Sequence, residues 1–147
     1  MPIPSTKTWD SLMLLIRIWL GYRMFTASYS SVVDIIFHPK ERAFFENWFG
    51  KELHFPMPLF MALLAKGAEL LGGILVMPGL MTRFAASLIA FTMVIATLVA
   101  NLGENWNIDG GFTVSYTLFA LILIVNGPGK YSLDSRLFRD RNDFTIN

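Results

Sequence analysis

The chain contains no cysteine among its 147 residues, and only two histidines. Without cysteine it has no disulfide, no thiol nucleophile and no cysteine-ligated iron–sulfur cluster of its own. A metal site built from His38 and His54 with Glu41 or Glu52 is less expected than ordinary solvated side chains in a loop. We therefore assign no catalytic residue, no metal ligand and no covalently bound cofactor from the sequence.

A strong excess of charge is also missing. Twelve Lys and Arg stand against eleven Asp and Glu, which gives a net charge of +1 and no reason to expect nucleic acid as a partner. Apolar side chains are abundant instead, since 54% of the residues are hydrophobic and the mean hydropathy is +0.49. They gather in long runs, which is typical of a membrane protein rather than of a large soluble core.

Four apolar runs have about the length needed to cross a bilayer as helices. At 1.5 Å per residue, about 20 residues cross the hydrocarbon core. The third run meets this length and the fourth is short. Turn residues separate the runs, as at Pro78-Gly79 and Gly127-Pro128-Gly129. The sequence thus predicts an all-α integral membrane four-helix bundle, with spans at about 12–33, 57–81, 84–102 and 112–125.

Residues 34–56 mix aromatic with charged side chains. This pattern predicts a short amphipathic helix at the membrane interface, in the loop on the outer side of the membrane. An ordinary loop helix is the alternative. The aromatic residues concerned are Phe44, Phe45, Trp48 and Phe49.

The loops differ in positive charge, and this difference predicts the orientation. Six Lys and Arg residues lie on the side that holds both termini, and three lie on the other side. Positive residues concentrate in cytoplasmic loops. We therefore expect a multi-pass protein of a bacterial inner membrane, with the N- and C-termini in the cytoplasm.

Glu69 lies in the middle of the second run. A carboxylate at that depth costs several kcal/mol, so it is expected to face the bundle interior and to be paired. Arg17, in the first run, lies at a similar depth and is the partner that we predict. Lys66, three residues before Glu69, is the alternative partner.

The spans carry more positive than negative charge. Arg17, Arg23 and Lys66 stand against Glu69 alone within the spans. The candidate partners for the outer cations, Arg23 and Lys66, are Asp34, Glu104, Asp109 and the hydroxyl group of Tyr116. This surplus favours an anionic or carbonyl-bearing ligand, such as a quinone, a lipid or a small anion. Arg17, Arg23, Lys66, Glu69 and Tyr116 form the candidate ligand-binding or buried charge cluster. A lock that only fixes the helix register is the alternative.

Small residues indicate where helices approach each other closely. Gly21 lies one turn after Arg17 on the same face, and Gly72 and Gly73 follow Glu69. We expect Gly21, Gly72 and Gly73 to serve helix packing.

Three segments carry motifs that are informative together. The first is Glu69-Leu-Leu-Gly72-Gly73, followed by Gly79-Leu-Met-Thr82-Arg83. The second is Arg17 followed by Gly21 and Phe25. The third is Gly127-Pro128-Gly129-Lys-Tyr-Ser132-Leu133-Asp134, directly after the fourth run. Together they resemble the DoxX family of small four-span membrane proteins, and the resemblance covers about residues 11 to 136. It departs near the end of the first run, where residues 26–31 replace a Gly and a Lys that the family often has.

The resemblance implies a DoxX-like four-span domain over residues 1–136 and a polar cytoplasmic tail over 137–147. It also implies an accessory subunit of a quinone-linked membrane oxidoreductase complex, rather than an enzyme on its own. The expected contacts are then the lipid bilayer, subunits of the redox complex, and a bound quinone or lipid; a homo-oligomer is left open. The alternative is a non-enzymatic, chaperone-like assembly protein that docks a partner through its outer loop.

Overall fold

The computed structural model describes residues 7–101 and 108–137, and every regular element in these ranges is a helix. The predicted all-α class is confirmed for this part of the chain. In chain order the elements are α1 (Lys7–Phe37), α2 (Pro39–Asn47), the π-helix η1 (Trp48–Glu52), α3 (Pro58–Val76), α4 (Thr82–Ile95), the π-helix η2 (Ala96–Asn101), α5 (Ile108–Asn126) and α6 (Leu133–Leu137).

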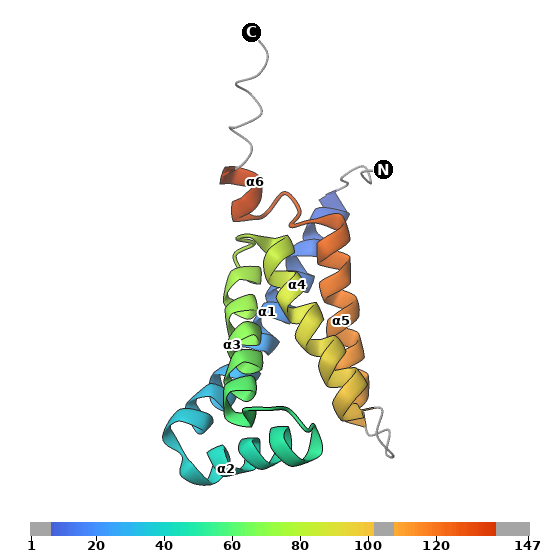
Figure 1. Ribbon diagram of the computed structural model, residues 1–147. Helices are drawn as coiled ribbons and strands as arrows, with labels where there is room; N and C mark the ends of the chain where they lie inside the picture. Colours follow the sequence, from blue (N-terminus) through green and yellow to red (C-terminus); the bar gives the residue numbers. More distant parts are fainter. Residues whose placement is uncertain (1–6, 102–107, 138–147) are drawn as a thin grey trace.

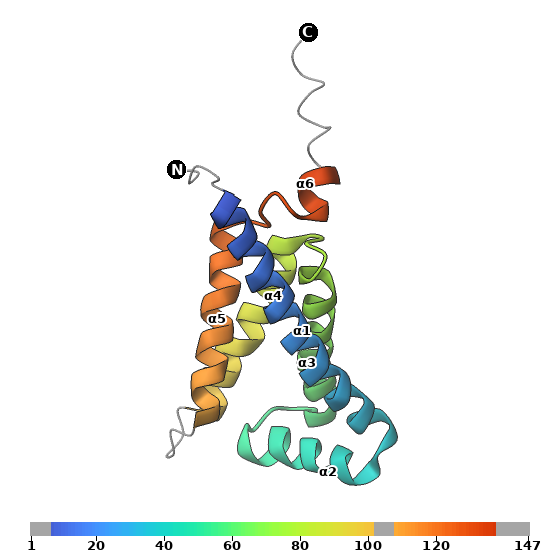
Figure 2. The same ribbon diagram turned by 180° about the vertical axis from the view of Figure 1, so that it is seen from behind.

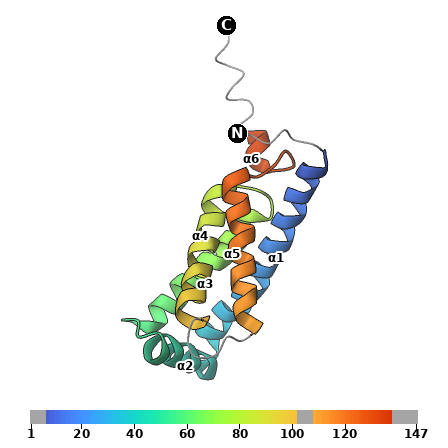
Figure 3. The ribbon, with the colours of Figure 1, turned by 90° about the vertical axis from the view of Figure 1, so that its right-hand side faces the viewer.

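Helices α1, α3, α4 and α5 form the body of the molecule (Figure 1). Helix α3 packs against α1 on one side and against α4 on the other, and α4 packs against α5. Helix α1 contacts α5 much less, because it leans away from α5 toward the end of the molecule that carries α2 (Figure 2). The start of α1 lies at the same end as α6, opposite to α2 (Figures 1 and 3).

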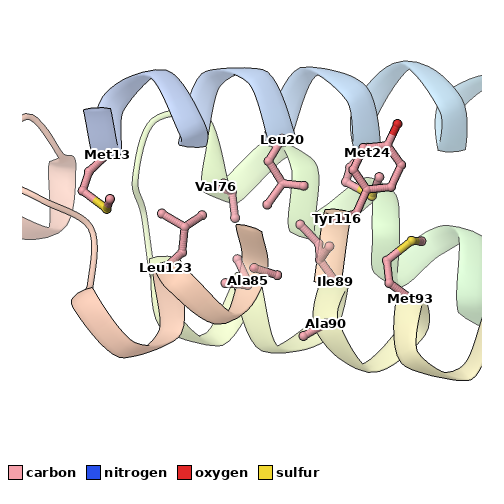
Figure 4. Close-up of a cluster of buried hydrophobic side chains, with 12 residues drawn as sticks. Met13, Leu20, Met24, Val76, Ala85, Ile89, Ala90, Met93, Tyr116 and Leu123 are labelled. Atoms are coloured by element: carbon pink, nitrogen blue, oxygen red, sulfur yellow. The ribbon is translucent and has the colours of Figure 1, made fainter. Parts of the chain in front are cut away.

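The main core lies between these four helices (Figure 4). Small residues on α4 let large aliphatic side chains from the other helices reach the centre, which is how helices of different side-chain volume pack closely. The core residues are Met13, Leu20, Met24, Val76, Ala85, Ala86, Ile89, Ala90, Met93, Tyr116, Ala120 and Leu123.

Only one helix of the described residues, α3, is both long and apolar enough to cross a membrane. The apolar stretches at 82–98 and 112–126 are shorter. Helix α3 ends at Val76, because Pro78 and Gly79 (φ +74°) form a turn. The second span was thus predicted too long at its end, and the third run is divided between α4 and η2.

The helix expected between the first two runs is present as α2, with η1 directly after it. Its aromatic side chains have two different environments. Phe49 is buried in a second, smaller core with Ile35 and Ala62, whereas Phe44 is 60% exposed. The aromatic residues of this segment therefore serve both to close the end of the bundle and to form an outer surface.

Candidate functional site

Glu69 lies within α3 and is 4% exposed. Its Oε2 atom accepts a hydrogen bond from Lys66 Nζ at 2.9 Å and another from Ser28 Oγ at 2.9 Å. Lys66 lies one turn earlier on the same helix, and Ser28 reaches across from α1. We call these three residues the Glu69 centre. The ammonium group of Lys66 and the hydroxyl group of Ser28 both donate to the carboxylate. A carboxylate is costly to bury unless it has such a counter-charge and hydrogen bonds.

Arg17 does not pair with Glu69, so the ion pair predicted from helix depth is wrong. Its side chain is 1% exposed, and its Nη1 and Nη2 atoms donate to the carbonyl oxygens of Pro128 (2.7 Å) and Tyr131 (2.6 Å). These carbonyl groups belong to the chain after α5, which folds back over the start of α1. The prediction compared only the membrane depths of residues within the spans, and these acceptors lie outside the spans. The alternative pair, Lys66 with Glu69, is the one that forms.

The closing segment, residues 127–137, is hydrogen-bonded both to the first half of α1 and to the turn between α3 and α4. The carboxylate of Asp134 accepts hydrogen bonds from the backbone N–H groups of Met81 (2.7 Å) and Thr82 (2.8 Å). A carboxylate at a helix N-terminus satisfies free donors and complements the helix dipole. In return, the N–H group of Asp134 donates to the carbonyl oxygen of Gly79 at 2.9 Å.

Gly79 shows how tightly this end is packed. It has a φ of +74°, and a Cβ atom there would lie 2.6 Å from Ser132 Cβ and would also meet the Arg17 guanidinium group. Asp10, in the first turns of α1, is a further tie, because its carboxylate accepts from Lys130 N at 3.4 Å. Most of the family-motif residues at this end therefore hold three parts together: the first half of α1, the turn between α3 and α4, and the closing segment. We call these contacts the lock.

The three glycines expected at helix contacts lie where backbones approach each other. A Cβ atom on Gly73 would lie 2.8 Å from the backbone nitrogen of Phe25 and 2.9 Å from the carbonyl oxygen of Gly21. A Cβ atom on Gly72 would lie 2.8 Å from Ile89 Cγ1 on α4. The crossing of α1 with α3 therefore depends on the pair Gly21 and Gly73.

Arg23 differs from Arg17 because its side chain lies on the outer surface of α1. Its Nε atom donates to the hydroxyl oxygen of Tyr116 on α5 at 3.3 Å, so this predicted partner is confirmed. Two other candidates, Glu104 and the side chain of Asp109, lie outside the described part of the structure. Within the described ranges, its two terminal nitrogens have no hydrogen-bond or ion-pair partner. A permanent positive charge thus faces outward from the helices.

Three further aromatic rings lie around Tyr116, the partner of Arg23. The Trp19 ring, one turn before Arg23, lies 5.6 Å from the ring of Tyr116 and 5.3 Å from that of Phe119, between ring centres. Phe112 stacks on Tyr116 at 6.5 Å. We call the surface formed by Arg23, Trp19 and Phe112, with the buried Tyr116 and the partly buried Phe119 behind them, the Arg23 face. It combines a set of free N–H donors with flat apolar rings.

The structure divides the five predicted cluster residues into three places. Lys66 lies with Glu69, Arg23 lies with Tyr116, and Arg17 is separate from both pairs. Sequence reasoning missed Ser28, although its position seven residues after Gly21 places both on one face of α1. It also missed Asp134 as a helix cap. The residues next to Asp134 do not indicate that it contacts a turn more than fifty positions earlier in the sequence.

Outside these sites the described residues offer little that could hold a metal or a large ligand. They contain no group of three or more His, Cys, Asp or Glu side chains placed to bind a metal ion. An open pocket of about 620 Å³ lies where α1 meets α2 and is lined by Asp34, His38, Pro39, Lys40 and Glu41. A smaller apolar pocket of about 210 Å³ lies between α4 and α5.

Comparisons with known proteins give relatives but no structural match. An uncharacterized protein of Haemophilus influenzae is 31% identical over 100 residues, which cover 61% of this chain and 66% of the relative. A protein of Bacillus subtilis named "Putative oxidoreductase CatD" is 29% identical over 90 residues, which cover 61% of this chain and 67% of the relative. The matches thus span about two thirds of these relatives. No solved structure matches. The DoxX family model matches residues 12–102, more than half of the chain, and the chain therefore belongs to the DoxX family.

Proposed function

We propose that α1, α3, α4 and α5 cross a bacterial inner membrane as a four-helix bundle. The DoxX family is membrane-associated. Only 28% of the most apolar window of α3 is buried inside the protein, whereas the core helix of a soluble protein is mostly buried. Large apolar side chains are also exposed along the other long helices, and lipid is the environment that such a surface fits. Examples are Leu15, Ile18, Phe91, Leu118 and Val125.

The proposed orientation places the start of α1 and the closing segment in the cytoplasm, and α2 with η1 on the outer side. The start of α1 and α6 lie together at one end of the bundle, as this orientation requires (Figure 1). Most of the loop Lys and Arg residues lie at that end, in keeping with the positive charge of cytoplasmic loops.

Within this membrane, we assign the chain the role of an accessory, non-catalytic subunit of a quinone-linked oxidoreductase complex. The observation that carries this proposal is the distribution of charge. Glu69 and Arg17 find their partners inside the chain, whereas the charge of Arg23 lies on the outside. A charged group without a counter-charge on a lipid-facing surface marks a functional contact. The similarity to a relative named as an oxidoreductase supports the redox part of the proposal.

Quinone or lipid is then bound at the boundary between this subunit and the rest of the complex. Arg17 and Glu69 are not suited to hold it directly, because both are buried and their hydrogen bonds are made within the chain. A cysteine-free chain supplies no thiol for redox chemistry, so that chemistry belongs to a partner subunit or to the bound quinone.

Purification in mild detergent tests this function. The tagged chain should bring with it a protein that reduces or oxidises a quinone, and lipid extracts of the preparation should contain quinone. A tagged four-span protein of another family, purified from the same membranes, is the control. Recovery of the chain alone, with neither quinone nor a redox partner, would overturn the proposal.

A second function is favoured by the pocket between α1 and α2 and by the exposed ring of Phe44. In this alternative, the outer region docks a client protein during membrane assembly. Deletion of residues 40–52 should then abolish function while Glu69→Gln is tolerated. The opposite result, loss in Glu69→Gln and tolerance of the deletion, would reject this alternative.

A further inference from the structure

We propose that the Arg23 face binds a transmembrane helix of a partner protein through a carboxylate that this helix carries near the middle of the bilayer. The inference rests on the proposed function, because it names the surface and the chemistry by which the accessory subunit joins its complex. It concerns the outward-facing side of α1 and α5, and not the buried Glu69 centre.

Arg23 lies deep in the proposed membrane. Along α1, Arg23 lies about 20 Å from Asp10, which is tied to the closing segment. Along α5, its neighbour Tyr116 lies about 15 Å from Asn126, where that helix ends. Both positions are therefore near the middle of a hydrocarbon layer of about 30 Å. A guanidinium group that faces lipid at this depth is strongly unfavourable without a compensating group.

Within the described residues, no ion pair joins a carboxylate to Arg23. Asp10 contacts Lys130, Glu69 is bonded to Lys66, and Asp34 pairs with His38. Tyr116 offers Arg23 only a neutral hydroxyl group at 3.3 Å. A second copy of this chain would bring these three carboxylates already paired, and its Glu41 and Glu46 lie on α2 at the end of the bundle. Charge complementarity at the depth of Arg23 therefore favours a different protein.

Three kinds of group could contact Arg23, and they differ in charge and in membrane depth. A lipid phosphate group is negative, but it lies at the membrane surface and not at the depth of Arg23. A quinone carbonyl reaches this depth but is neutral, so it leaves the positive charge in place. A carboxylate cancels the charge and accepts two parallel N–H bonds from an arginine. The free terminal nitrogens of Arg23 fit this last geometry.

The rings around Arg23 supply the contact area for such a helix. Trp19 is 44% exposed and Phe112 is 52% exposed. Apolar area gives little selectivity between helices inside a bilayer, because lipid tails are equally apolar, and hydrogen bonds between helices supply it instead. The aromatic rings thus shape the surface, and Arg23 selects the partner.

Synthetic transmembrane helices test the proposal with the purified full-length chain in phosphatidylcholine vesicles. The probes are three polyleucine peptides with Glu, Leu or Lys at the central position, compared over a series of alkaline buffers because burial raises the pKa of the Glu side chain. Energy transfer between a labelled peptide and the labelled chain reports binding. The Glu peptide should bind about tenfold more tightly than the Leu peptide, a difference of about 1.4 kcal/mol.

Three variants make the test specific. Arg23→Gln should abolish the preference for the Glu peptide, and Arg23→Glu should transfer the preference to the Lys peptide. Arg83→Gln is the matched control, because Arg83 is an exposed arginine at the start of α4, away from the bundle centre, and it should keep the preference. Circular dichroism of each variant checks that its helix content is unchanged.

Equal binding of the Glu and Leu peptides to the wild-type chain would overturn the proposal. So would self-association of the chain that depends on Arg23, which would identify a second copy as the occupant. Binding of a short-chain ubiquinone analogue that depends on Arg23, with no peptide preference, would overturn it in favour of a neutral ligand. The proposed function fails separately: a redox partner can co-purify with a chain that shows no peptide preference, and this result would remove only the docking surface.

Discussion

At the scale of single residues, the two ends of the Lys66–Glu69 pair are not equivalent. The Glu69 side chain is 5% exposed, whereas that of Lys66 is 24% exposed. A lysine left alone can turn its long side chain toward a more polar region, but a carboxylate buried among helices cannot. The two partners should therefore differ in what their removal costs.

We expect Lys66→Met to destabilise the protein by about 3 kcal/mol, because it leaves the Glu69 carboxylate buried with only Ser28 as a donor. Glu69→Gln should cost about 1 kcal/mol, because the amide keeps an acceptor for Ser28 and Lys66 can move. Unfolding in mixed detergent and dodecyl sulfate micelles measures both values.

The double variant Lys66→Met with Glu69→Gln provides the control for this asymmetry. It removes both charges at once and should be more stable than Lys66→Met alone, because no uncompensated charge is left in the interior. Equal losses in the two single variants, or a double variant that is the least stable of the three, would contradict the prediction.

Residue types alone indicated that Glu69 must be paired, because the cost of a buried carboxylate does not depend on the fold. They also gave Lys66 as one candidate and Tyr116 as a candidate for Arg23. The partner of Arg17 could not be found in this way. Its acceptors are backbone carbonyl groups, which every residue has, so no side chain in the sequence marks them.

At the scale of helices, the crossing of α1 and α3 sets the geometry of the Glu69 centre. Ser28 can reach Glu69 only because Gly21 and Gly73 let the two backbones come into contact nearby. The glycine pattern correctly predicted that helices pack closely at these positions. It could not tell which glycine meets which helix, because that depends on the rotation of each helix about its own axis.

Gly73→Ala tests this crossing. The added methyl group would lie 2.8 Å from a backbone nitrogen of α1, which cannot move aside as a flexible side chain can. We expect a loss of about 1–3 kcal/mol in the free energy of unfolding. Gly67, on the same helix, is the matched control, because a methyl group added there would have nothing within 4 Å.

Gly67→Ala should leave stability unchanged or raise it by up to about 1 kcal/mol, because alanine restricts the unfolded chain and favours the helix. The comparison separates steric contact from helix propensity, since both substitutions are the same chemical change. A Gly73→Ala protein as stable as Gly67→Ala would show that the two helices can separate at no cost.

At the scale of the whole molecule, hydropathy predicted the helical class of the described residues. It did not predict the lock at the end of the bundle. The turn between α3 and α4 and the closing segment each look like ordinary loops in the sequence. Their mutual hydrogen bonds, from Thr82 to Asp134 for example, exist only once the helices have brought the two loops to the same end.

The absence of cysteine makes the proposed orientation easy to test, because any introduced cysteine is the single thiol in the chain. Lys40→Cys should react with a membrane-impermeant maleimide in intact cells whose outer membrane is permeabilised. Ser135→Cys should react only in inverted inner-membrane vesicles. Labelling of both variants from one side of the membrane would rule out the proposed four-span topology.

The bonds between Arg17 and the closing segment also have a consequence for biosynthesis. Each bond joins residues 111 or 114 positions apart, so Arg17 is translated long before its acceptors. In the proposed topology, the guanidinium group must meanwhile be accommodated by water, lipid head groups or an insertion factor. These bonds therefore form only after all four long helices have been synthesised. A ribosome that stalls within α5 would thus leave Arg17 without either of its acceptors.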